Sequence, residues 1–399
     1  MNKSKTALTQ KREIYFDNAA TTAPLFFVCD ADAARDNART IQSEALFPRG
    51  SNPSSPHALG IRAERELAAA RADFAATLSC RASEIVFTSG GTEANNLAIL
   101  GFALANKRRG ASIFAAPWEH PSVLEPIKFA AEQGLTDAGV FANSSNCAAG
   151  QSANRPIAPR LVCLSHVSHE TGDICNLTET AARLKKENPE TIVFVDGAQG
   201  FCKEMLSLAN IDMYSFSGHK IHGASGFGGL FIRGGLRLVP LLHGGGQENA
   251  LRAGTENLRG ALKTAHAAKT LAADLKKNHT HAADLKSSLL ELTRALPDVF
   301  ENALTATTSP YILNLSFIGI KGETLVHVLS ENGIYASMGA ACRSRKKQKS
   351  ALEVMGFDKS RAESAVRFSF SHLNTLEETE TVKKIIIKKV SELRRILKR

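Results

Sequence analysis

Short apolar runs alternate with helical stretches between about residues 84 and 235. The apolar runs are EIVFTSGG, RLVCLSHVS, TIVFVDGAQG, IDMYSFSGHK and GFGGLFIRG. Runs of this length that alternate with helical patterns are typical of strands in a largely parallel sheet covered by helices. The pattern therefore predicts an α/β unit. Ligands of such units collect at the carboxyl ends of the strands.

From about residue 262 the pattern changes to long amphipathic helices, followed by strand candidates at YILNLSF and AVRFSFS. This change predicts a second, smaller α+β domain. We expect the large domain to comprise residues 18–262 and the small domain to comprise residues 1–17 and 263–399. The polar segment at 141–160 interrupts the alternation and predicts a surface loop.

The last predicted helix begins at TLEE, a capping-box sequence. One face of this helix is apolar and consists of Val382, Ile385, Ile386, Val390, Leu393 and Leu397. Packing against the core is the simpler explanation of this face. Docking to a membrane or a partner is the alternative.

Composition narrows the classes of protein. The 399 residues are 43% hydrophobic and 22% charged, and no apolar run approaches the roughly 20 residues that cross a bilayer. The first twelve residues are polar and basic, which predicts a frayed tail instead of a signal peptide. The seven cysteines are scattered without a CxxC pair, which favours a reducing compartment over a disulfide framework or zinc ribbon. We expect a cytoplasmic protein that does not enter a membrane.

The net charge of +10 raises the possibility of nucleic-acid binding. Much of the excess lies in the last helix and in the cationic run after Cys342. The chain has one Trp and four Tyr and carries no known nucleic-acid motif. These features disfavour a nucleic-acid partner.

Lys220 follows an apolar strand in DMYSFSGHKIHG and precedes a glycine-rich turn. A lysine inside an α/β crevice loses hydration, which favours its neutral amine and makes it a nucleophile toward aldehydes. Ser217 and His219 beside it could bind a phosphate. His219 and His222 could instead suggest a metal pair, but no carboxylate or cysteine cluster accompanies them, so we predict no metal site. A surface lysine after an edge strand is the alternative for Lys220.

Two further segments carry candidate ligands. Asp196 ends the apolar run TIVFVD, and a buried acid needs a partner such as a pyridinium nitrogen, with a helix cap or a metal as alternatives. Gly91 and Thr92 precede a helix, where free N–H groups and a hydroxyl could hold an anion. One ligand carries a partner for each of these three features. Pyridoxal 5'-phosphate has an aldehyde for Lys220, a ring nitrogen for Asp196 and a phosphate for the helix start.

With these residues in place, the chain resembles the cysteine desulfurases of the class V aminotransferase group. The resemblance implies the fold type I architecture of pyridoxal-phosphate enzymes, with a mostly parallel seven-stranded sheet in the large domain and a smaller α+β domain. Matching motifs run from YFDNAATT near the start to AVRFSFS near the end. The motifs SFSGHKIHG and LLHGGGQENALRAGTEN are very specific, and GSNPSSPHALG and WEHPSVLEP support them. The resemblance implies a homodimer that converts L-cysteine to L-alanine and passes sulfur to an acceptor protein.

The resemblance also implies roles for single residues around the cofactor. Lys220 would hold the cofactor and move the substrate Cα proton. Asp196 would pair with the pyridine nitrogen, and Gln199 would reach the phenolic oxygen. His120 would stack on the ring and help to move protons, whereas a structural histidine is the alternative.

Further roles concern the phosphate, the substrate and the partner subunit. The predicted phosphate ligands are Gly91, Thr92, Ser217, His219 and, from the neighbouring subunit, Thr255. Arg367 would clamp the substrate carboxylate, because its planar guanidinium suits bidentate binding. His169 replaces an asparagine that contacts the cofactor's phenolic oxygen in the family.

Cys342 lies where the family keeps the thiolate that takes up sulfur as a persulfide. Five cations, at 343, 345, 346, 347 and 349, follow it and favour the thiolate, although salt screens exposed charges. A solvated loop that merely contains a thiol is the alternative. The sequence around Cys342 departs from the usual serine-rich pattern.

Three hypotheses remain open from the sequence. The first is an active cysteine desulfurase that supplies an iron–sulfur scaffold or a tRNA-thiolation protein. The second is a selenocysteine lyase or another class V lyase or aminotransferase. The third is a regulatory homologue that keeps the cofactor and the dimer but has reduced activity.

Overall fold

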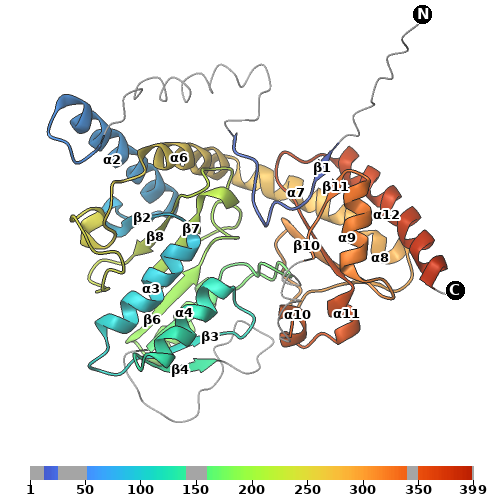
Figure 1. Cartoon of the computed structure of the whole chain (residues 1–399), viewed down its shortest axis with the longest axis horizontal. Helices are drawn as coiled ribbons and strands as arrows, with labels where there is room; N and C mark the ends of the chain where they lie inside the picture. The colour runs from blue at the N-terminus through green and yellow to red at the C-terminus, as the bar shows by residue number, and fades with distance from the viewer. Residues whose placement is uncertain (1–12, 26–51, 141–159, 339–348, 398–399) are drawn as a thin grey trace, which may run out of the picture.

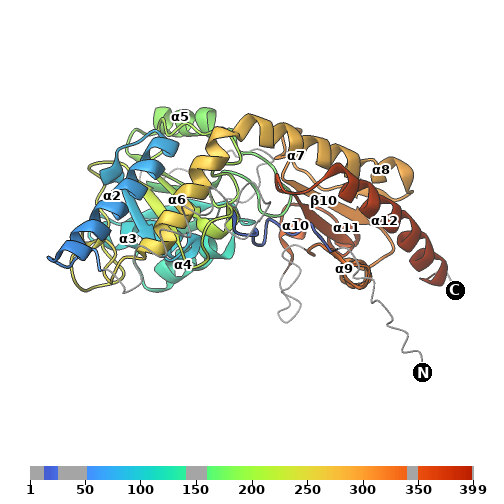
Figure 2. The same ribbon diagram turned by 90° about the horizontal axis from the view of Figure 1, so that it is seen from above.

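A computed structural model of the chain describes residues 13–25, 52–140, 160–338 and 349–397. These residues form a large unit and a small unit side by side, with the large unit at the left of Figure 1. Helix α7 (Leu275–Leu290) leads from one unit into the other, as Figure 2 shows from above. Cys342 and the predicted surface loop, apart from Arg160, lie outside the described residues.

The large unit is built on a seven-stranded sheet with strand order β2-β8-β7-β6-β5-β3-β4. In this sheet β8 alone runs against the other described strands. The strands are β2 (Ile85–Thr88), β3 (Ser112–Ala115), β4 (Asp137–Val140), β5 (Arg160–Ser165), β6 (Thr191–Asp196), β7 (Met213–Ser217) and β8 (Gly228–Ile232). The predicted mostly parallel seven-stranded sheet is confirmed, and all five of the apolar runs form strands.

Helices cover both faces of this sheet and enclose two apolar cores. On one face lie α3 (Gly91–Ala105) and α4 (Pro121–Glu132). On the other face lie α2 (Ala58–Leu78), α5 (Leu177–Glu187) and α6 (Leu258–Ala273). Helix α6 packs along α2 and crosses residues 262 and 263, where the sequence predicted the division between domains.

Helix α2 illustrates why these segments form helices. Its buried residues include Ala63, Leu67, Ala70, Phe74 and Leu78, a spacing of three or four that places them on one face. The side chain of His57 accepts a hydrogen bond from the first turn. The left-handed backbone of Ser79, with φ 55°, ends the helix.

The small unit contains an antiparallel three-stranded sheet of order β12-β10-β9. Its strands are β9 (Val299–Glu301), β10 (Ile312–Phe317) and β12 (Ala365–Ser369), so both late strand predictions are confirmed. The N-terminal strand β1 (Ile14–Tyr15) pairs in parallel with β11 (Ile334–Tyr335). The surrounding helices are α8 (Leu292–Ala295), α9 (Gly322–Glu331), α10 (Ala351–Val354), α11 (Lys359–Glu363) and α12 (Leu376–Leu397).

Helix α12 begins with the predicted capping box. The hydroxyl of Thr375 accepts a hydrogen bond from the N–H of Glu378, and the Glu378 carboxylate accepts one from the N–H of Thr375. Val382, Ile386 and Val390 are fully buried in the small core, and Ile385 and Leu393 pack against it. The packing explanation is confirmed for these five residues, whereas Leu397 at the end of the face is 61% exposed. No described helix combines the length and apolar character that a membrane crossing requires.

Candidate active site

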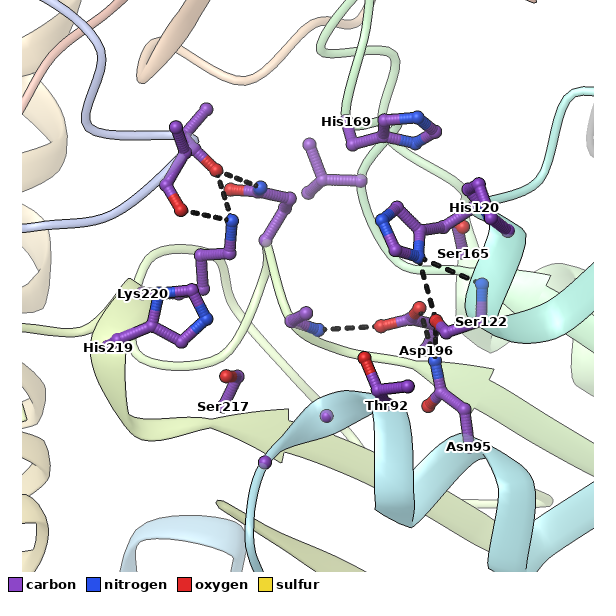
Figure 3. Close-up of a pocket in the computed structure, with 18 of the residues that line it drawn as sticks. Thr92, Asn95, His120, Ser122, Ser165, His169, Asp196, Ser217, His219 and Lys220 are labelled. Atoms are coloured by element: carbon purple, nitrogen blue, oxygen red, sulfur yellow. Dashed lines mark hydrogen bonds between the residues drawn. The ribbon is translucent and has the colours of Figure 1, made fainter. Parts of the chain in front are cut away.

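The carboxyl ends of three parallel strands and the start of α3 surround a cavity of about 750 Å³. Ser165, Asp196 and Ser217 are the last residues of β5, β6 and β7, and all three line the cavity (Figure 3). The other predicted residues in its lining are Gly91, Thr92, His120, His169, Gln199, His219, Lys220 and Arg367. The structure therefore gathers nearly all of the predicted site residues at the expected edge of the sheet.

Two predicted site residues are not among those that line this cavity. Thr255 is exposed on the large unit. Cys342 lies outside the described residues, and the nearest described residue before it is Met338. The roles of these two residues therefore stay predictions.

One end of the cavity is suited to an anion. Helix α3 begins at Gly91, and the first N–H groups of a helix have no acceptor inside the helix. A Cβ atom placed on Gly91 would lie 3.4 Å from the Ser217 Cβ atom and 3.9 Å from its hydroxyl oxygen, so the helix start lies close to this hydroxyl. Burial, and then the charge of Lys220, lowers the pKa of His219 to about 4, so its imidazole is neutral at pH 7.

Asp196 is held by fixed donors at the end of β6. Its Oδ1 accepts a hydrogen bond from the N–H of Ala198 at 3.0 Å, and its Oδ2 accepts one from Nδ2 of Asn95 at 2.8 Å. The Asp196 residue is 7% exposed. A carboxylate held in this way is a preorganised partner for a cationic ring nitrogen.

Lys220 lies in a short 3-10 helix, Gly218–Lys220, directly after β7. Its Nζ donates hydrogen bonds to the carbonyl oxygens of Ala19 at 2.5 Å and Ala20 at 2.7 Å. Burial, and then the charge of Arg367, lowers the pKa of Lys220 to about 8. A much larger fraction of this amine is neutral at physiological pH than of an ordinary lysine.

Gln199 faces the same N-terminal segment as Lys220. Its Nε2 donates to the carbonyl oxygen of Ala19 at 2.8 Å. Its Oε1 is buried and has no hydrogen-bond partner among the described residues. A buried amide oxygen without a donor is costly, which indicates that a bound group completes this part of the cavity.

Two histidines lie on the opposite wall of the cavity. Nδ1 of His120 accepts a hydrogen bond from the N–H of Ser122 at 3.1 Å and thereby caps α4. The ring centroids of His120 and His169 are 5.1 Å apart, with the planes at 82°. Nε2 of His169 lies 3.4 Å from Oε1 of Glu170, which is buried. Figure 3 shows both rings at the cavity.

Arg367 reaches the cavity from β12 of the small unit and is 6% exposed. Its Nη2 lies 3.3 Å from Oδ1 of Asp17, and its Nη1 donates to the carbonyl oxygen of His169 at 2.6 Å. Its Nε is buried and has no hydrogen-bond partner among the described residues. This guanidinium therefore retains donor capacity for a carboxylate.

Sequence reasoning missed several residues that organise the site. Asn95 and Ser122 bind one another and connect to Asp196 and His120. Asp17 lies within the motif YFDNAATT but received no role. A signal for Asn95 was present, because it follows Thr92 by one helical turn and asparagine is a poor residue for a helix interior.

The two histidines of the SGHKIHG motif bind different partners. His219 contacts Thr21, with Nδ1 3.2 Å from its hydroxyl oxygen, whereas Nδ1 of His222 lies 2.6 Å from the carbonyl oxygen of Ala23. Within the described ranges, no three His, Cys, Asp or Glu side chains are grouped to hold a metal ion.

Comparisons with known proteins cover almost the whole chain. Residues 14–382 match the family described as aminotransferase class-V. The chain is 37% identical over 380 residues to a NifS/IcsS protein homolog of Lactobacillus delbrueckii subsp. bulgaricus, covering 92% of this chain and 94% of that protein. It is 32% identical over 391 residues to a cysteine desulfurase IscS of Buchnera aphidicola subsp. Schizaphis graminum. This match covers 96% of this chain and 94% of that protein.

Solved structures show the same similarity. A NifS-like protein superposes with a TM-score of 0.84 at 32% identity and covers 95% of this chain and 100% of its own. A structure titled SspA in complex with cysteine superposes with a TM-score of 0.74 at 26% identity. The superposition covers 91% of this chain and 100% of that one.

Proposed function

The chain belongs to the class-V aminotransferase family, and from this premise we propose that it is a pyridoxal-phosphate-dependent cysteine desulfurase. It converts L-cysteine to L-alanine and keeps the sulfur as a persulfide on Cys342. The observation that carries this proposal is the convergence of Lys220, Asp196 and the start of α3 on one cavity.

The residues of the cavity fit pyridoxal 5'-phosphate. The start of α3 and Ser217 suit its phosphate, Asp196 suits its ring nitrogen, and Lys220 suits its aldehyde. We infer that Gln199 and His169, which line the same cavity, would contact its phenolic oxygen. When bound, the cofactor withdraws electrons from the substrate carbon that loses a proton, which makes the substrate sulfur electrophilic.

Lys220 is suited both to binding the aldehyde and to accepting a proton. Its lowered pKa supplies the neutral amine that each task needs. The carbonyl oxygens of Ala19 and Ala20 accept hydrogen bonds from Nζ and hold the amine at the cavity. Arg367, with its unpartnered Nε, orients the carboxylate of L-cysteine.

The position of Ser337 supports the role of Cys342. Ser337 and Arg367 exchange backbone hydrogen bonds of 3.0 and 2.7 Å, so the chain leaves the described fold beside the substrate clamp. Cys342 follows Ser337 by five positions, a maximum reach of roughly 17 Å. The Cys342 thiolate attacks the substrate sulfur, an S–S bond forms and the C–S bond breaks, with its electron pair remaining on the carbon that becomes alanine.

We also propose an oligomeric state, a cellular compartment and a sulfur acceptor for this enzyme. We place the enzyme in the cytoplasm as a homodimer in which Thr255 serves the partner's cavity. The described cysteines Cys80, Cys163, Cys175 and Cys202 are free thiols, which suits a reducing compartment. An iron–sulfur scaffold or a tRNA-thiolation protein would accept the sulfur.

The test measures alanine and sulfide release from L-cysteine by the intact chain with and without Cys342→Ala. We expect Cys342→Ala to lose most turnover, while Cys80→Ala retains it, because burial raises the pKa of the Cys80 thiol to about 11. Equal sulfide release from the Cys342→Ala variant would exclude the thiolate role. A chain that binds the cofactor but releases neither product would favour the regulatory homologue.

Substrate choice needs a separate measurement. Selenide release from L-selenocysteine at a much higher kcat/KM than sulfide release from L-cysteine would favour a selenocysteine lyase. Lys220→Ala should abolish both reactions and the covalent attachment of the cofactor, which borohydride reduction and mass spectrometry detect.

A further inference from the structure

A hydrogen-bonded chain of four side chains links two walls of the cavity. It runs from Asp196 through Asn95 and Ser122 to His120 (Figure 3). We propose that Asn95 and Ser122 are positioning residues that hold His120 as a neutral ring with its proton on Nε2. The inference deepens the proposed function, because His120 faces the cofactor that function requires.

Asp196 determines which groups donate and which accept along this series of hydrogen bonds. Nδ2 of Asn95 lies 2.8 Å from Oδ2 of Asp196 and 2.8 Å from Oγ of Ser122. An amide nitrogen has two N–H groups, so it can donate to both oxygens. A flipped amide would place Oδ1 against the carboxylate, and acceptors repel one another. Asn95 Oδ1 is buried without a hydrogen-bond partner in the described structure, a cost that the two donated bonds offset.

Ser122 in turn donates its hydroxyl proton to His120. Because Oγ of Ser122 accepts from Asn95, its own hydroxyl proton is available for Nδ1 of His120, 2.7 Å away. The backbone N–H of Ser122 also donates to Nδ1, at 3.1 Å. Two donors directed at one nitrogen leave no place for a proton on Nδ1. The proton of the neutral ring is therefore on Nε2.

Helix α4, which follows His120, also favours the neutral ring. His120 caps α4, whose twelve residues point the positive end of their dipole at the ring. A second positive charge at this position is unfavourable, so the neutral imidazole is preferred. The ring can then donate a hydrogen bond from Nε2 but cannot take up a proton at that atom. Lys220 is left as the group that accepts the substrate proton.

The acidic groups around His120 each have a partner of their own. The carboxylate of Glu119 accepts hydrogen bonds from the N–H and hydroxyl of Ser165. Oε1 of Glu170 lies 3.4 Å from Nε2 of His169, whose ring centroid is 5.1 Å from that of His120. Asp196 acts on His120 through Asn95 and Ser122.

Nitrogen NMR of the histidine rings tests the proposal directly. The holoenzyme of the full chain is labelled with ¹⁵N-histidine, and the His120 signals are those that His120→Asn removes. At pH 7.5 we expect the pattern of a neutral ring with the proton on Nε2. A ring protonated on Nδ1, alone or on both nitrogens, would overturn the proposal.

Asn95→Asp tests the role of the amide. The new carboxyl group shares one proton with Asp196, because two carboxylates at hydrogen-bond distance do not both ionise. Its other oxygen accepts the Ser122 hydroxyl, which turns away from Nδ1. We expect protonation of Nδ1 to become about tenfold more favourable, the effect of losing one hydrogen bond. Asn96→Asp is the matched control, because Nδ2 of Asn96 donates to the carbonyl oxygen of Thr92 within the same helix. Identical His120 spectra for the two variants would refute the role of Asn95.

Ser122 provides a second test that does not add a charge. Ser122→Ala should shift the His120 signals toward protonation on Nδ1, and Ser122→Thr, which keeps the hydroxyl, should restore the native pattern. An unchanged pattern in Ser122→Ala would remove Ser122 from the proposal. Cofactor absorbance checks that each variant is folded. The NMR pattern does not depend on turnover, so absence of desulfurase activity would refute the proposed function without deciding the state of His120.

Discussion

Arg367 of the small unit donates a hydrogen bond from Nη1 to the backbone carbonyl oxygen of His169 in the large unit, at 2.6 Å. The same guanidinium contacts Asp17, which precedes the segment that binds Lys220. The substrate clamp is thus held by both units at once. Its geometry depends on how the two units pack against one another.

Arg367→Lys should therefore impair substrate binding more than the chemical step. A lysine keeps the charge but cannot contact His169, Asp17 and a carboxylate with one planar group. We expect KM for L-cysteine to rise about 10–100-fold, with a smaller change in kcat. Steady-state kinetics measure both constants, and Lys359→Arg on the exposed helix α11 serves as the control. An unchanged KM would contradict the carboxylate role.

The lowered pKa of Lys220 predicts how cofactor attachment depends on pH. With a pKa of about 8, the neutral fraction of the amine rises about fivefold between pH 7 and 8 and levels off above pH 9. The rate of covalent attachment to the cofactor-free chain should follow this curve, as absorbance measures. A rate that still rises about tenfold per pH unit above pH 9 would indicate an ordinary lysine.

Lys220 also affects stability, in a direction that follows from the same shift. Between the folded pKa of about 8 and the ordinary value of 10.5, the folded chain binds fewer protons than the unfolded chain. The contribution of Lys220 to the free energy of unfolding therefore rises with pH in this window. Below pH 8 the burial of the ammonium group carries its full cost.

Lys203 offers a clearer test of buried charge. It is 6% exposed, its Nζ lies 5.9 Å from the ring centroid of Tyr311, and burial lowers its pKa to about 7. Lys203→Met should raise the free energy of unfolding by about 1–3 kcal/mol at pH 6. The gain should shrink as pH rises from 7 toward 10.5, because native Lys203 then loses its charge.

Urea denaturation at several pH values measures this difference. Lys269→Met is the control, because Lys269 is exposed and pairs with Asp73 at 3.5 Å, so the expected change is within about 0.5 kcal/mol. A destabilised Lys203→Met variant at pH 6 would show that the ammonium group is better compensated than its burial suggests.

Gly197 tests the packing that places Asp196. A Cβ atom on Gly197 would overlap the ring of Tyr214. This ring cannot easily move, because it is fully buried and its hydroxyl oxygen forms a hydrogen bond of 2.9 Å with Nδ1 of His166. Gly197→Ala should therefore lower the free energy of unfolding by about 2–4 kcal/mol and weaken cofactor binding. Gly246→Ala, where no described atom lies within 4 Å of the added carbon, should change stability by less than about 0.5 kcal/mol. Similar losses in the two variants would contradict the packing argument.

The sequence by itself determined five strands of the large sheet, the order of the motifs and the nature of the main ligands. Apolar runs predicted β2, β5, β6, β7 and β8 because strand formation depends on local periodicity. Lys220 and Asp196 could be identified because each directly follows such a run. The quoted runs do not include β3 and β4, and the role of Cys342 stays a prediction.

Only the tertiary structure decided how these ligands are held. Asn95 bonds to Ser122, 27 residues away, and to Asp196, 101 residues away. Arg367 meets Asp17 across 350 residues. Such bonds depend on how helices and strands pack, which no local pattern encodes. The pKa of Lys220 follows from the same packing, because burial and the approach of Arg367 set the cost of its charge.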